Sequence, residues 1–105
     1  MKKGYYITDN GEKVIINSQE FINLSNKNIV ELILPSGVKY VYCSNNQLKE
    51  LILPSGVKYV HCSNNQLKEL ILPSGVKYVS CDKGAIKDPM IYKDWDIDLK
   101  IYFYK

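Results

Sequence analysis

The side chains with the most obvious chemistry in this 105-residue sequence are three cysteines and one histidine. Cys43, Cys62 and Cys81 are spaced nineteen residues apart, and His61 directly precedes the second of them. Thiolates and imidazoles are the ligands that zinc prefers, so a metal site has to be considered. However, there is no close CxxC pair, and consecutive strand residues such as His61 and Cys62 point to opposite faces. We therefore expect buried, reduced cysteines and neither a metal nor another cofactor.

His61 is also the sequence's one candidate for acid–base catalysis. Its expected neighbours are Tyr42 and Ser80 in the adjoining repeats and Tyr59 and Ser63 in its own strand. A histidine beside a serine suggests nucleophilic catalysis, but no acidic residue stands where it would orient the imidazole. The sequence therefore predicts no catalytic residue and no enzymatic activity.

An internal repeat positions these side chains. Residues 38–56 read VKYVYCSNNQLKELILPSG and residues 57–75 read VKYVHCSNNQLKELILPSG, so the two nineteen-residue units differ only at Tyr42 and His61. Residues 29–37 match the end of a unit, and residues 76–81 match its beginning. A fixed period of this length is typical of stacked repeat architectures. We therefore expect about four coils in one domain.

Each coil is predicted to contain one strand with two different faces. Alternation over residues 40–44 turns Val41 and Cys43 to one side and Tyr40, Tyr42 and Ser44 to the other. Strands that stack about 4.8 Å apart place equivalent residues over one another. The prediction is one inner column of Val41, Val60 and Val79 and another of the three cysteines. The Leu-Pro-Ser-Gly end of each unit favours a turn and disfavours a helix.

The spacing LxxLxLxxNxL followed by Leu-Pro resembles the leucine-rich-repeat family, in its short bacterial form, over roughly residues 19–94. The resemblance implies a leucine-rich-repeat solenoid with a parallel β-sheet on the concave side, an extended or turn-rich convex side and little or no helix. Its coils would be 19–37, 38–56, 57–75 and 76–94. The family's asparagine ladder matches Asn46 and Asn65, whereas Lys27 and Gly84 stand at this position in the outer coils. The ladder is therefore predicted to fail at both ends.

Both ends of the solenoid are predicted to be closed by β structure, because open sheet edges invite uncontrolled pairing. Residues 1–18 predict a capping hairpin, since Asn10-Gly11 is a strong hairpin signal between two apolar runs. Residues 95–105 predict a capping strand whose apolar face consists of Ile97, Leu99, Ile101 and Phe103. Met90 and Trp95 are expected to fill the space beneath it.

The composition limits the cellular locations and the classes of partner that we expect for this chain. The sequence contains no secretory signal and no long apolar segment, so we expect a cytoplasmic protein without membrane contact. The net charge of +3 comes from lysine alone, and the absence of arginine argues against sequence-specific nucleic-acid recognition. The content of Lys, Asn, Ile and Tyr is typical of an AT-rich genome, which suggests a phage or viral factor in its host's cytoplasm, or a bacterial adaptor.

The outward residues of the sheet are the predicted binding site for a protein partner, because aligned tyrosines provide rigid contact area. The concave-face residues are Tyr40, Tyr42, Ser44, Tyr59, His61, Ser63, Tyr78, Ser80 and Asp82. A basic stripe of Lys39, Lys58 and Lys77 lies beside them. Three alternatives stay open: tyrosines that only shield the sheet, weak nonspecific nucleic-acid binding, and self-association, in which an edge-mediated homodimer replaces the monomer.

Overall fold

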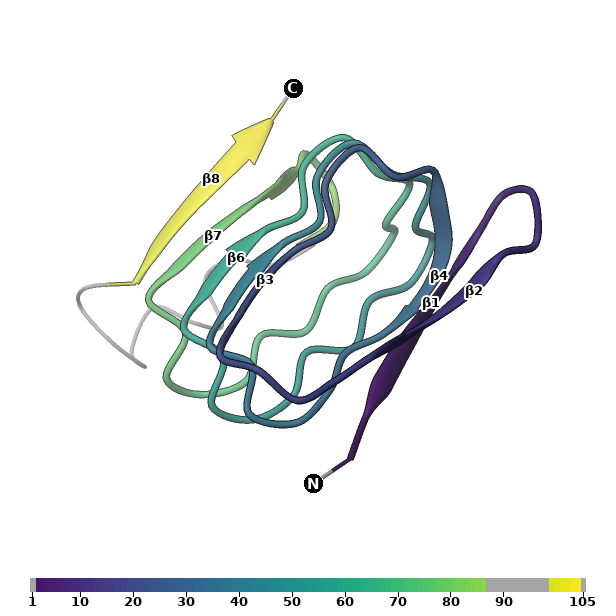
Figure 1. The fold of residues 1–105 in the computed structure, drawn as a ribbon. Helices are drawn as coiled ribbons and strands as arrows, with labels where there is room; N and C mark the ends of the chain where they lie inside the picture. The colour runs from purple at the N-terminus through teal and green to yellow at the C-terminus, as the bar shows by residue number, and fades with distance from the viewer. Residues whose placement is uncertain (1, 87–98, 105) are drawn as a thin grey trace.

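The computed structural model describes residues 2–86 and 99–104 of the chain as a parallel β-solenoid of about four turns (Figure 1). No helix occurs in these residues. The strands are β1 (Gly4–Thr8), β2 (Lys13–Ile16), β3 (Phe21–Asn23), β4 (Ile29–Ile33), β5 (Tyr40–Tyr42), β6 (Tyr59–His61), β7 (Tyr78–Asp82) and β8 (Lys100–Tyr104). Met90, Trp95 and Ile97 lie outside the described residues.

Five parallel strands form one side of the solenoid in the order β3-β5-β6-β7-β8. Val41 pairs with Val60, and Val60 pairs with Val79, so equivalent residues of successive coils are direct neighbours. The predicted inner column is therefore confirmed. The register extends it by Ile22 at one end and Ile101 at the other.

The core is filled by residues that recur every nineteen positions. Val41, Val60 and Val79 have no exposed surface, and neither do the three cysteines. From the opposite side, which we call the return side (residues 29–34, 48–53 and 67–72), leucines complete the core; they are Leu32, Leu48, Leu51, Leu53, Leu67, Leu70 and Leu72. A single coil could not bury this surface, so the stack stabilises every coil within it.

Two corners in each inner coil allow the chain to turn without a helix. Asn45 and Asn64 follow the strands with φ of 60° and 57°, and asparagine tolerates this left-handed conformation better than most residues. Gly56 and Gly75 follow the return segments with φ of 90° and 92°, where a side chain would be strained. The corner residues therefore let both inner coils turn at the same two places.

The asparagines after these corners bind the backbone of neighbouring coils. The Asn46 amide oxygen accepts from the backbone N–H groups of Lys27 and Ile29, each at 3.0 Å, and its amide nitrogen donates to the Leu24 carbonyl at 2.8 Å. Asn65 accepts from Leu48 N–H at 3.0 Å. Since these groups are shielded from water, their pairing is needed to avoid a desolvation cost.

The N-terminal hairpin is present and joins the return side. β1 pairs antiparallel with β2, and only Gly11 of the Asn10-Gly11 pair has a positive φ, at 88°. The other edge of β1 pairs antiparallel with β4, so the first return segment becomes a strand. A Cβ atom on Gly4 would lie 2.1 Å from the Ile33 carbonyl oxygen, so glycine permits this close approach.

The C-terminal strand β8 continues the parallel sheet. Ile101 aligns with Val79 and Phe103 with Cys81, an offset of 22 residues instead of nineteen. Leu99 and Ile101 pack against the core, whereas Phe103 is 42% exposed. All five residues of β8 pair with β7, whereas contact with the core comes from Leu99, just before the strand, and from Ile101.

Candidate functional site

The outer surface of the five-stranded sheet carries aromatic side chains in two adjacent columns. Alternation along each short strand sends residues 40 and 42, and their equivalents, outward, while Val41 points into the core. The parallel register then aligns Tyr40, Tyr59 and Tyr78 in one column. Tyr42 and His61 lie in the second column.

The rings contact one another from the first strand of the sheet to the last. Tyr40 and Tyr59 are stacked with parallel planes and centroids 5.0 Å apart. The centroid of the His61 ring is 4.5 Å from that of Tyr42 and 4.9 Å from that of Tyr78. We call the connected set the aromatic face; it comprises Phe21, Tyr40, Tyr42, Tyr59, His61, Tyr78 and Tyr102.

Two members of the aromatic face were not among the predicted site residues. Phe21 has its ring centroid 5.2 Å from that of Tyr42, and Tyr102 lies 5.2 Å from Tyr78. The repeat contained a signal for Phe21, because it precedes Tyr40 by nineteen residues. It contained none for Tyr102, because the last strand is offset by 22 residues.

Four polar residues of the predicted site form hydrogen bonds within the solenoid. Ser63 is buried, and its hydroxyl is 2.7 Å from the Ser80 hydroxyl. The Ser44 hydroxyl accepts from the Ser63 backbone N–H at 3.2 Å. The Asp82 carboxylate accepts from the backbone N–H groups of Asn64 and Asn65 at 2.7 and 2.8 Å. These bonds hold adjacent coils together where the strands end.

Asp82 takes over the end of the asparagine ladder. The inner coils bond Asn45 N–H to the Ser63 carbonyl, whereas Asn64 N–H meets the Asp82 side chain. Gly84 has no side chain with which to continue the ladder, in agreement with its predicted end there. The carboxylate instead satisfies the last pair of backbone donors.

The basic stripe lies along the margin of the aromatic face. Lys39 forms an ion pair with Glu20 at 3.4 Å, and its side chain is 46% exposed. Lys58 and Lys77 are half-buried, and the backbone N–H of each donates to the carbonyl of the preceding lysine. Because Glu20 compensates Lys39, the stripe is less basic than the sequence suggested.

The histidine and the cysteines are held in their neutral forms. Partial burial lowers the pKa of His61, so its imidazole is uncharged at neutral pH. Burial raises the pKa of the Cys43 thiol to about 12 and that of Cys62 well above its usual value. Neutral thiols are poor nucleophiles and poor metal ligands. In residues 2–86 and 99–104, no group of three or more His, Cys, Asp or Glu could hold a metal ion.

Comparisons with protein-family models, with curated proteins and with solved structures each return no match to this chain. No helix in the described part of the chain is long and apolar enough to cross a membrane.

Proposed function

We propose that this chain is a short leucine-rich-repeat protein that binds another protein through the aromatic face and catalyses no reaction. The observation that carries the proposal is the ring network across all five strands of the sheet. Tyrosine is enriched at the energetic centres of interfaces, where its ring gives apolar contact and its hydroxyl gives a hydrogen bond. Mutual packing holds these rings in place before a partner arrives, which lowers the entropy cost of binding.

The geometry of the rings favours a protein over a nucleic acid. Bases bind aromatic side chains by stacking on their faces. In Tyr40 and Tyr59 each ring already turns one face to the other, so these two faces are not open to a base, whereas the ring edges and hydroxyls can meet a ligand. Protein side chains pack readily against such edges, and the pairing of Lys39 with Glu20 weakens the attraction for phosphates.

The proposed setting is the cytoplasm, where a phage or viral factor or a bacterial adaptor acts on another protein. A photo-crosslinking amino acid in place of Tyr59 should capture the partner, and the same amino acid in place of the exposed Glu12, in the N-terminal hairpin, provides the control. Mass spectrometry then identifies the captured protein.

The affinity of the partner gives the decisive measurement. Tyr40→Ala/Tyr59→Ala/Tyr78→Ala should weaken its binding at least a hundredfold, because several interface anchors are lost together. The control Lys49→Ala/Lys68→Ala changes exposed residues of the same coils and should bind as the original chain does. Equal affinity of the triple tyrosine variant, or captured material that is only nucleic acid, would refute the proposal.

A further inference from the structure

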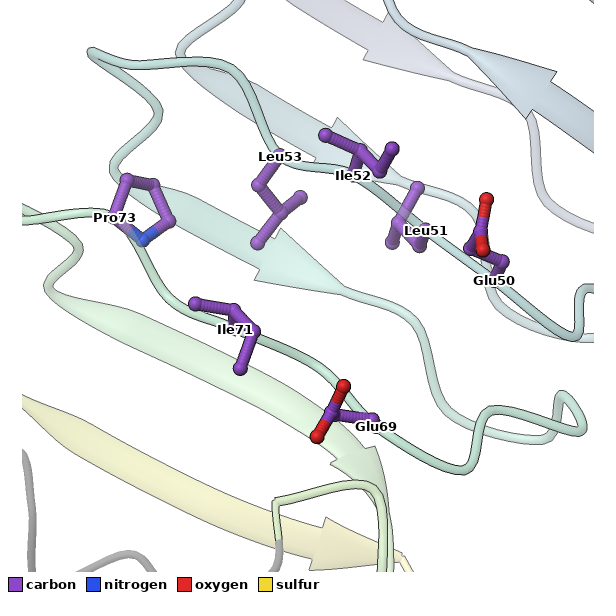
Figure 2. A pocket seen from close by; sticks show the side chains of 7 residues that line it. All are labelled: Glu50, Leu51, Ile52, Leu53, Glu69, Ile71 and Pro73. Atoms are coloured by element: carbon purple, nitrogen blue, oxygen red, sulfur yellow. The ribbon is translucent and has the colours of Figure 1, made fainter.

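The return side contains a hollow of about 360 Å³ between the second and third coils, which we call the return groove (Figure 2). Leu51 and Leu53 are buried and form its inner part. Ile52 and Ile71 border it and are 67% and 63% exposed. Figure 2 shows the carboxylates of Glu50 and Glu69 at one end of the groove. Among the described residues no lysine lines it, and its described lining is apolar with an acidic end.

The same seven residues, Glu-Leu-Ile-Leu-Pro-Ser-Gly, occur at 31–37, 50–56 and 69–75. In the first of these copies, strand β1 of the chain itself shows which chemistry the sequence accepts. Tyr5 pairs directly with Ile33, and its hydroxyl donates to a Glu31 carboxylate oxygen at 2.8 Å. The Lys13 ammonium lies 4.4 Å from the centre of the Tyr5 ring. An aromatic residue is therefore paired with the isoleucine and donates a hydrogen bond to the glutamate, while the lysine contacts the aromatic ring.

The second and third copies carry the same groups on their surface. Glu50 and Glu69 are exposed, as are the isoleucines beside them. A second hollow of about 370 Å³ is lined by residues that include Tyr5, Glu31, Lys49 and Glu50, so it meets the return groove at Glu50. Large exposed aliphatic side chains gathered on one face are typical of interaction sites.

We propose that the return groove binds an extended peptide segment of a partner protein, with aromatic or aliphatic side chains next to lysine or arginine. The apolar side chain packs against Ile52 and Ile71, and the cation meets Glu50 and Glu69. The carboxylates repel polyanions, so the peptide chemistry differs from that of a nucleic acid. This site lies on the side opposite the aromatic face and does not depend on the function proposed for that face.

The probe is a fluorescent synthetic peptide with the sequence of residues 2–8, Lys-Lys-Gly-Tyr-Tyr-Ile-Thr, titrated with the full chain and followed by anisotropy. We expect saturable binding that weakens as salt is added. Glu50→Lys/Glu69→Lys and Ile52→Ser/Ile71→Ser should each raise Kd at least tenfold. Lys49→Glu/Lys68→Glu, on the same segments, should keep the affinity or improve it. All six changed residues are exposed, and circular dichroism checks that each variant is folded.

The possible outcomes separate the occupants of the groove. Absence of saturable binding overturns the proposal. Equal Kd for the groove variants also overturns it, because the peptide then exchanges with β1 at the edge of β4. Concentration-dependent sedimentation of the chain that Glu50→Lys/Glu69→Lys abolishes would instead assign the groove to a second copy. The Tyr40→Ala/Tyr59→Ala/Tyr78→Ala variant should bind the peptide unchanged, which distinguishes this site from the aromatic face.

Discussion

The two sides of the solenoid carry the same nineteen-residue repeat and use it differently. On the sheet side, Tyr40 and Tyr59 lie one coil apart with their rings stacked at 5.0 Å. On the return side, Ile52 and Ile71 are also one coil apart, yet each remains about two-thirds exposed. A planar ring is large enough to cover its equivalent in the next coil, whereas a branched aliphatic side chain is not. Equivalent side chains therefore pack against one another on the sheet side, which makes that surface self-supporting. On the return side they stay exposed to solvent.

The residues of the two sides are therefore expected to differ in how much they contribute to folding stability and to binding. The aromatic face contributes to stability through its ring contacts, and it is also the surface proposed for binding. The exposed return residues contribute little to the fold, and a binding role for them is a proposal. Substitutions on the two sides should consequently differ in what they damage.

The prediction with the largest expected effect tests whether the exposed residues of the return side contribute little to folding stability. Leu70 is 1% exposed and its neighbour Ile71 is 63% exposed. We expect Leu70→Ala to lower the free energy of unfolding by about 3–4 kcal/mol, since it leaves a cavity in the core. Ile71→Ala should change it by less than about 0.5 kcal/mol. Urea unfolding measures both, and a loss above 1 kcal/mol for Ile71→Ala would break the comparison.

The next effect concerns the junction between the two sides. Asn65 accepts from Leu48 N–H and donates to the carbonyls of Cys43 and Cys62, at 3.0 to 3.1 Å. Asn65→Ala leaves these groups without their partner and should destabilise the chain by about 2–3 kcal/mol. The adjacent exposed residue provides the control, because Gln66→Ala removes no interior contact. Similar urea midpoints for both variants would show that water replaces the asparagine at little cost.

A third test addresses the core that both sides share. Burial raises the pKa of Cys43 from 9.0 to about 12. Below pH 9 the folded and unfolded chains both keep this proton, so its contribution to stability is constant there. Between pH 9 and 12 the unfolded chain releases a proton that the folded chain retains, and stability falls by about 1.4 kcal/mol per pH unit. In Cys43→Ala, the free energy of unfolding measured by urea titration at each pH should decline less steeply with pH. Parallel curves for the variant and the original chain would mean that the thiol is accessible to water.

Much of the fold could be predicted from the sequence, because the repeat forces equivalent residues into contact. Val41, Val60 and Val79 became neighbours as expected, and Phe21 could have been placed by the same period. Tyr102 could not be placed, since the last strand departs from that period.

The parts that escaped prediction depend on contacts without a local sequence signal. The pairing of β1 with β4 requires the close approach at Gly4, which is visible only in three dimensions. The internal bonds of Ser63 and Asp82 likewise arise from coil stacking, so alternation alone assigned both to the binding surface. The exposed groups of the return side attracted no functional prediction, because Lys-Glu pairs look locally compensated along the chain.

The smallest expected effect is also the most direct measure of the contrast between the two sides. A double-mutant cycle on Tyr40→Ala and Tyr59→Ala should give a coupling energy of about 0.5–1.5 kcal/mol, the range for contacting aromatic pairs. The matching cycle on Ile52→Ala and Ile71→Ala should give a value near zero, because two largely exposed side chains share little surface. Both pairs are one coil apart, so spacing is held constant and only the side chain differs. Equal coupling energies would mean that the period alone, and not the stacking of rings, makes the sheet side self-supporting.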